Sequence, residues 1–90
     1  MIENIKELTV VDFYANWCGP CKMLAPIIES VCEENNINLL KINVDESEEA
    51  IKHGIMSIPT IFIVKNGTVL EKKIGLISKE EIINMINKHK

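Results

Sequence analysis

The stretch VVDFYANWCGPCKMLAPII, residues 10–28, joins an apolar, β-branched run directly to two cysteines with two residues between them. Residues 8–15 have the composition of a strand that is buried on both faces of a sheet. Residues 21–35 carry apolar side chains at helical spacing, with glutamates on the opposite, solvated side. Cys18 therefore stands where a buried strand is expected to end and a helix to begin.

A Cys-x-x-Cys pair alone is compatible with a metal site, a structural disulfide or a redox site. The chain has 3 cysteines, and this odd number argues against a full disulfide framework. The third, Cys32, falls on the apolar side of its helix and is expected to be a small core residue. Structural zinc needs four ligands, whereas His53 and His89 lie far along the chain. Metal binding by one chain is therefore disfavoured, although two chains could share a cluster.

The position of the pair suits thiol–disulfide exchange. Pro20 would lie in the first helical turn, where its missing N–H costs nothing. The Cys18 sulfur would then face the free N–H groups and the positive end of the helix dipole, which favour thiolate over thiol. Cys21 lies one turn further along and can attack a mixed disulfide formed at Cys18. Gly19 leaves the exposed corner bare for an approaching protein.

Composition narrows the classes of function. The 90 residues are expected to form one domain, residues 1–90, with a net charge of −3. All ten basic residues are lysines, so the arginine forks typical of nucleic-acid recognition are missing, and no basic block suggests a membrane surface. The N-terminus does not resemble a signal peptide, and no apolar run approaches the length of a membrane helix. We therefore expect a cytoplasmic protein.

The remaining segments predict a mixed sheet covered by helices on both faces. The first two strands would be parallel, because a helix crosses between them. Asn66-Gly67 between two β-rich runs predicts a hairpin. The expected elements after residues 21–35 are a strand at 37–44, a short helix with a capping box at Asp45 and Glu48 that ends at Gly54, the hairpin, and a last helix with a capping box at Ser78 and Glu81.

Four segments together resemble the thioredoxin family over nearly the whole chain. They are residues 10–28, KINVDE (41–46), GIMSIPTIFIVKNG (54–67) and IGLISKEEI (74–82). The resemblance implies the thioredoxin fold, an α/β fold with three layers, α/β/α. Its four-stranded mixed sheet would contain two parallel strands joined by a crossover helix and then an antiparallel hairpin. The usual first strand of the fold would be missing, which would leave residues 37–44 as an exposed edge.

The resemblance also implies catalytic roles. Cys18 matches the attacking cysteine and Cys21 the resolving one. Asp12 matches a buried carboxylate that moves protons for the resolving thiol. A lone strand aspartate can instead be a solvated edge residue, but this strand is otherwise apolar, and a buried carboxylate is costly unless it is used. Lys41 matches a lysine that can approach Asp12, and a plain surface lysine is the alternative.

A substrate groove is implied as well. Pro59 matches a cis-proline that faces the two sulfurs, and it leaves the backbone of Ile58 free to pair with an extended substrate. Pro26, inside the helix, matches a structural proline. Tyr14 and Ser57 depart from the family pattern, which often has tryptophan and glycine there. The residues expected to form the groove are Trp17, Gly19, Pro20, Ile58 and Gly75.

The resemblance implies a monomeric protein that reduces disulfides of target proteins without a bound cofactor, because the two sulfurs carry the electrons. A thioredoxin reductase-type electron donor would regenerate the dithiol. A glutaredoxin-like protein is one alternative, but the chain has neither a Cys-Pro-Tyr-Cys type of motif nor an arginine to bind glutathione carboxylates. A binding or assembly module with incidental redox activity is a second alternative. A metal or cluster module is a third.

Overall fold

The computed structural model describes residues 1–90. After a short N-terminal helix, its elements follow the predicted order of a strand, a helix, a strand, a short helix, a hairpin and a last helix. They are η1 (Ile2–Asn4), β1 (Thr9–Tyr14), α1 (Gly19–Glu34), β2 (Asn38–Asn43), α2 (Glu49–Lys52), β3 (Thr60–Lys65), β4 (Thr68–Ile74) and α3 (Lys79–His89). None of the helices combines the length and the apolar character needed to cross a membrane.

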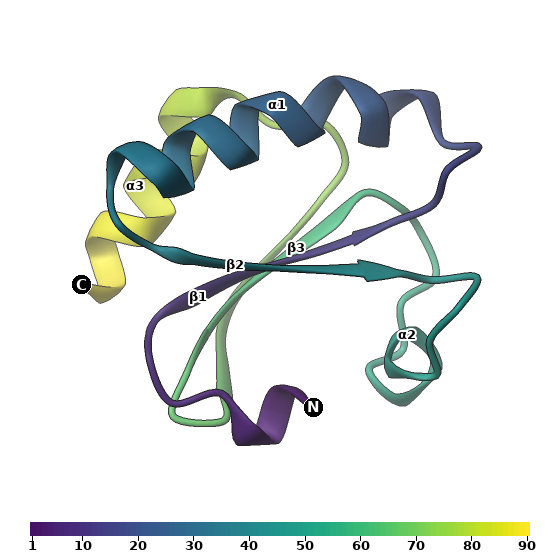
Figure 1. Cartoon of the computed structure of the whole chain (residues 1–90), viewed down its shortest axis with the longest axis horizontal. Coiled ribbons are helices and arrows are strands. Elements are labelled where there is room, and N and C mark those ends of the chain that lie inside the picture. Colours follow the sequence, from purple (N-terminus) through teal and green to yellow (C-terminus); the bar gives the residue numbers. More distant parts are fainter.

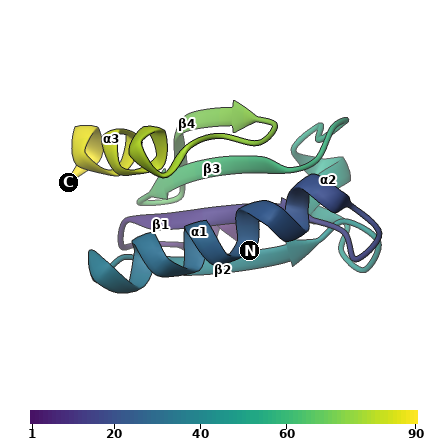
Figure 2. The ribbon, with the colours of Figure 1, turned by 90° about the horizontal axis from the view of Figure 1, so that it is seen from above.

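The four strands form one mixed sheet in the order β2-β1-β3-β4, which Figure 2 shows from above. β1 is parallel to β2 and antiparallel to β3, and β3 and β4 are antiparallel. This confirms the predicted four-stranded sheet, in which α1 makes the crossover between the two parallel strands. It also confirms that β2 is an edge strand.

Helices cover both faces of the sheet, as the three-layer prediction requires. α1 and α3 lie on one face, and α2 and η1 lie on the other (Figure 1). Successive residues of β1 point to opposite faces, so Val10 joins the core under α1 while Val11 and Phe13 join the core beside α2. All three side chains are 0% exposed. β1 is therefore the buried centre of the molecule.

Two of the local sequence signals form the structures that they predict. Asn66 and Gly67 both have positive φ, 52° and 71°, and they connect β3 to β4 as a tight hairpin turn. Ser78 caps α3, because its hydroxyl accepts a hydrogen bond of 3.1 Å from the backbone N–H of Glu81.

The predicted capping box at Asp45 is wrong, because α2 begins only at Glu49. Asp45 lies in the turn that follows β2, and its backbone N–H donates a 2.9 Å hydrogen bond to Oδ1 of Asn43. Asparagine side chains compete with helices by forming such local bonds. The Ser47 hydroxyl accepts the Glu49 N–H at 3.2 Å.

The N-terminal turn η1 closes the core beside α2. Ile2 is 1% exposed, and its backbone N–H donates to Oε1 of Glu49 in α2 at 3.3 Å. The carbonyl of Ile5 accepts a 2.7 Å hydrogen bond from the N–H of Gly67. A Cβ at Gly67 would lie 2.7 Å from the backbone oxygen of Glu3, so only glycine fits there. η1 thus joins the hairpin turn to α2.

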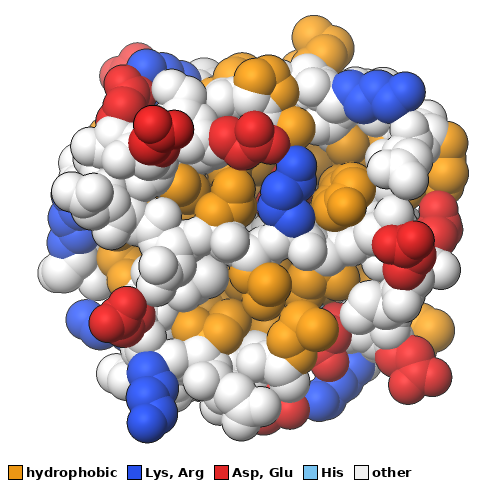
Figure 3. All heavy atoms as spheres, in the orientation of Figure 1, with side chains coloured by type: hydrophobic (Ala, Val, Ile, Leu, Met, Phe, Trp, Pro, Cys, Tyr) orange, Lys and Arg blue, Asp and Glu red, His pale blue; other side chains and the backbone are white.

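Apolar side chains remain visible on the side of the molecule where β2 forms the edge. Figure 3 shows them above and below the middle of this face, with a basic side chain among the upper ones and other charged groups towards the margins. The partly buried side chains that flank β2 include Ile37, Leu39, Leu40 and Val44. The structure thus leaves the edge strand uncovered.

Replacing Ile2 by alanine tests whether η1 holds the fold together. We expect Ile2→Ala to lower the free energy of unfolding by about 2–4 kcal/mol, because a fully buried isoleucine loses its packing and leaves a cavity. Urea unfolding followed by circular dichroism measures the change. Ile51→Ala is the matched control, since Ile51 is 83% exposed, and it should change stability by less than about 0.5 kcal/mol. Equal stability of Ile2→Ala and the parent protein would contradict a structural role for η1.

Candidate active site

Cys18 and Cys21 are joined by a disulfide at the start of α1. Cys18 is the N-cap residue, with extended backbone, and its Sγ accepts a 3.2 Å hydrogen bond from the N–H of Cys21. Pro20 lies in the first helical turn, as predicted. The pair can hold two electrons as two thiols, and the N–H groups at the helix start favour the thiolate form of Cys18.

A cis-proline loop lies beside the pair. The Ile58–Pro59 peptide bond is cis, and Ile58 packs against the cluster that contains both cysteines. Two hydrogen bonds fix this loop. The N–H of Gly75 donates to the carbonyl of Pro59 at 2.8 Å, and the Thr60 hydroxyl donates to the carbonyl of Ser57 at 2.6 Å. The loop therefore presents a defined backbone next to the disulfide.

An apolar groove of about 190 Å³ borders this loop. Trp17 is 70% exposed along it, and its indole Nε1–H donates to Oδ2 of Asp45 at 2.7 Å. Met56 is 96% exposed. Such a shallow apolar surface suits an extended peptide more than a small molecule. The residues that line the groove are Trp17, Val44, Ile55, Met56, Ser57 and Ile58.

The five predicted groove residues are only partly brought together. Trp17 and Ile58 line the groove. Gly19 and Pro20 are exposed at the start of α1, and a Cβ at Gly19 would meet nothing within 4 Å. Gly75 follows β4 with φ of 94°, and it does not line the groove, although its N–H donates to the carbonyl of Pro59. The corner above the disulfide is thus open.

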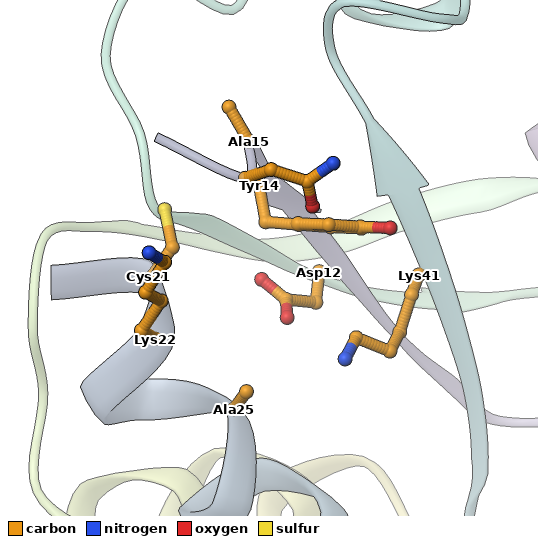
Figure 4. A pocket seen from close by; sticks show the side chains of 8 residues that line it. Asp12, Tyr14, Ala15, Cys21, Lys22, Ala25 and Lys41 are labelled. Atoms are coloured by element: carbon orange, nitrogen blue, oxygen red, sulfur yellow. The ribbon is translucent and has the colours of Figure 1, made fainter. Parts of the chain in front are cut away.

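A second pocket, of about 170 Å³, leads from the surface to Asp12. In Figure 4 the Asp12 carboxyl group points into the space between Cys21 of α1 and Lys41 of β2. Asp12 is 2% exposed, and its Oδ1 has no hydrogen-bond partner. Burial raises the pKa of Asp12 to about 6, against a partial opposing effect of the Lys41 charge, and the negative charge of Glu29 adds to the rise.

Lys41 reaches this pocket without pairing with Asp12. The two residues are register partners in the parallel β1–β2 pair, so their side chains share a face of the sheet. The Lys41 ammonium forms an ion pair with Oε2 of Glu29 at 2.9 Å and lies 5.2 Å from the centre of the Tyr14 ring. Lys41 therefore approaches Asp12 as predicted, in that both residues line one pocket, but no direct bond joins them.

The comparisons with known proteins agree with one another. The thioredoxin family model matches residues 1–88. The thioredoxin of Bacillus subtilis is 43% identical over 90 residues, which cover 97% of this chain and 86% of that protein. The thioredoxin of Rickettsia typhi is 46% identical over 82 residues, covering 88% of this chain and 78% of that protein. The chain belongs to the thioredoxin family.

Solved structures show the same fold. A mutant thioredoxin from Halobacterium salinarum superposes with a TM-score of 0.87 at 33% identity, over 93% of this chain and 75% of that one. The thioredoxin of Fasciola hepatica superposes with a TM-score of 0.86 at 36% identity, over 98% of this chain and 86% of that one. The predicted thioredoxin fold is thus confirmed.

As a member of this family with a Cys18–Cys21 pair at disulfide distance, the protein is a thiol–disulfide oxidoreductase that reduces protein disulfides. Family membership also implies, in general terms, target proteins that contain disulfides and a reductase that supplies electrons. The remaining cysteine, Cys32, is 3% exposed in the core under α1, as predicted. No three His, Cys, Asp or Glu side chains are grouped to hold a metal ion.

The sequence interpretation missed two residues that lie around the site. Glu29 was expected only on the solvated side of the helix, yet it lies four residues after Ala25 and eight after Cys21, a spacing that places all three on one helix face. Asp45 was expected to cap α2, yet it binds Trp17. Its position at the end of β2, beside the end of the parallel strand β1, was the available signal.

The raised pKa of Asp12 makes a prediction about stability. The folded protein binds the Asp12 proton up to about pH 6, whereas the usual value is 3.8, so stability falls as pH rises through this window. Asp12→Asn removes that cost, and we expect it to raise the free energy of unfolding by about 2 kcal/mol at pH 7.5, with the gain shrinking towards pH 4. Urea unfolding of the oxidised proteins at both pH values measures this. Glu46→Gln, at an exposed position, should show no such gain, and an Asp12→Asn gain that does not depend on pH would contradict the assignment.

Proposed function

We propose that Cys18 is the nucleophile and Cys21 the resolving thiol of this protein-disulfide reductase. The assignment rests on one observation above all, the position of Cys18 as the N-cap of α1 beside the open corner at Gly19. Helix N–H groups favour the Cys18 thiolate, and nothing at Gly19 blocks a protein substrate. Cys21 follows inside the helix, within reach of any disulfide that Cys18 forms.

The reduced protein would react in two exchange steps. The Cys18 thiolate attacks one sulfur of the target disulfide, the target S–S bond breaks, and the other target sulfur leaves as a thiolate. The Cys21 thiol then gives up its proton, and its sulfur attacks Sγ of Cys18. The mixed disulfide breaks, and the second target sulfur leaves. Two electrons pass to the target, whose thiolates take up protons, and the protein is left with the Cys18–Cys21 disulfide.

Asp12 is the proposed acceptor of the Cys21 proton. Its pKa of about 6, raised by burial, lies near neutral pH, where a carboxylate is both available and basic enough to accept a proton. Both groups line the same 170 Å³ pocket, and that space is large enough for a bridging water molecule. Lys41, in the same pocket, would stabilise the Asp12 carboxylate by its positive charge.

The groove beside the cis-proline is the proposed site for the target polypeptide. Ile58 lies just before β3 and packs beside the sulfurs, so its backbone groups are available for pairing with an extended segment. Pro59 would hold this backbone in place. Side-chain and backbone contacts to the target would come from Trp17, Gly19, Pro20, Ile58 and Gly75.

The setting of the reaction follows from its chemistry. A protein that reduces disulfides repeatedly needs an external electron donor, and we propose a reductase of the thioredoxin reductase type. Residues 1–90 would act as one domain and as a monomer, on protein substrates, without nucleic acid or membrane. The cytoplasm is the proposed compartment, because protein thiols are kept reduced there.

Two cysteine variants test the proposal. We expect Cys18→Ser to lose insulin-disulfide reduction with dithiothreitol down to the rate without protein, because no attacking thiolate remains. Cys21→Ser should instead accumulate a mixed disulfide with the target, visible on non-reducing gels, because the release step is lost. Cys32→Ala serves as the control and should keep full activity. Retained activity of Cys18→Ser, or a trapped complex on Cys18→Ser in place of Cys21→Ser, would overturn the assignment.

A further inference from the structure

The Glu29 carboxylate holds the ammonium of Lys41, the lysine of β2 whose charge could pair with Asp12. Lys41 comes from the strand next to Asp12, and its ammonium lies at 2.9 Å from Oε2 of Glu29 and over the face of the Tyr14 ring at 5.2 Å. Oδ1 of Asp12 meanwhile has no hydrogen-bond partner. The lysine thus sits at the mouth of the pocket while the buried carboxyl group stays unpaired.

Apart from this arrangement, few charged groups surround Asp12. Its partner on the β3 side is Ile61, which carries no charge. The titratable and charged groups that face the carboxyl group or share its pocket are Cys21, Lys22, Glu29 and Cys32 from α1, Tyr14 from β1 and Lys41 from β2. Of the two lysines in this group, Lys41 is the one whose charge is held in place by an ion pair.

We propose that Glu29 is a positioning residue of this active site: it holds the Lys41 ammonium at the pocket mouth, away from the Asp12 carboxyl group, and so keeps that group able to accept a proton. The inference rests on the proposed role of Asp12 as acceptor of the Cys21 proton.

The Glu29–Lys41 pair is well placed for this role and poorly placed for stabilising the fold. The two side chains are 52% and 37% exposed, and exposed pairs of this kind contribute about 0–1 kcal/mol. An opposite charge within about 4–6 Å of a carboxyl group, by contrast, lowers its proton affinity strongly. The pair therefore matters for the position of the Lys41 charge relative to Asp12. The negative charge of Glu29 itself acts in the same direction, since it also raises the pKa of Asp12.

The first experiment follows the Asp12 carboxyl carbon by ¹³C NMR during a pH titration of the intact protein. In Glu29→Gln the amide no longer holds the ammonium as an ion pair, so Lys41 can turn towards Asp12, and we expect the midpoint to fall by about one pH unit. Glu33→Gln removes the same charge one helical turn further along, at an exposed position without an ion-pair partner, and should leave the midpoint in place. An unchanged midpoint in Glu29→Gln, or equal shifts in the two variants, would overturn the inference.

A double-mutant cycle shows whether Glu29 acts through Lys41. Lys41→Met alone should move the Asp12 midpoint upwards, because a nearby positive charge is lost. Adding Glu29→Gln to Lys41→Met should then lower the midpoint by much less than Glu29→Gln does in the parent protein, because only with Lys41 present is there a released ammonium that can move towards Asp12. The same full shift with and without Lys41 would overturn the positioning role, because Glu29 would then act directly.

Kinetics connect the shift to the reaction and separate the two proposals. The rate of Cys21 attack on the mixed disulfide should fall at acid pH, which gives the pH–rate profile an acid limb. In Glu29→Gln the pH of this limb should fall together with the NMR midpoint. A limb that stays in place while the midpoint moves would overturn the functional part of the inference. Asp12→Asn should abolish the acid limb. If it does not, the proposed role of Asp12 fails, whereas the two NMR experiments still decide whether Glu29 controls the position of Lys41.

Discussion

Strand β1 lies between β2 and β3, so both of its backbone edges are hydrogen-bonded and both of its faces are covered by helices. Thr9 to Phe13 are buried along it, and only Tyr14 at its end is partly exposed. The chain that leaves its carboxyl end must therefore turn out of the sheet at once, and it does so by starting α1 at Gly19. The reactive pair forms at that turn. The geometry of the disulfide site is thus a consequence of how the central strand is buried.

The same burial explains the chemistry of Asp12. A carboxyl group on the central strand has lost most of its water, and its ionised form is destabilised in consequence. A pocket beside Cys21 reaches this carboxyl group, and Lys41, which also lines the pocket, is paired with Glu29. A residue that weakens the fold at neutral pH is therefore retained where proton transfer would need it.

Two of the three local turn and cap signals in the sequence were dependable. Asn66-Gly67 and Ser78 specify their turn and cap through contacts within three residues, so composition alone predicts them. The cap at Asp45 failed because a neighbouring side chain, Asn43, binds its N–H and because its carboxylate meets Trp17, which is 28 residues away in the chain. Such contacts depend on the tertiary fold, which a local pattern does not contain.

The candidate site shows the same division. The sequence identified Cys18 and Cys21 because the pair stands where a buried strand meets a helix, and it identified Asp12 because the resemblance to the thioredoxin family implies a role for a carboxylate in that otherwise apolar strand. It did not identify Glu29, because the direction of a long side chain on a solvated helix face is decided by its partner on β2. Nor did the sequence show that Ile2 would fill the core beside α2 or that Gly67 would pack on the backbone of Glu3. These contacts join segments that are far apart in the chain.

The spacing of the two cysteines has a further consequence for the unfolded chain. They are three residues apart in sequence, so the disulfide closes a very small ring. By loop-closure entropy such a ring stabilises a fold by about 2 kcal/mol, against nearly 5 kcal/mol for a loop of about a hundred residues. Opening the ring therefore releases little of the conformational restraint on the unfolded chain, and closing it adds little. The exchange of two electrons therefore makes or breaks a covalent link only between residues 18 and 21, at the first turn of α1.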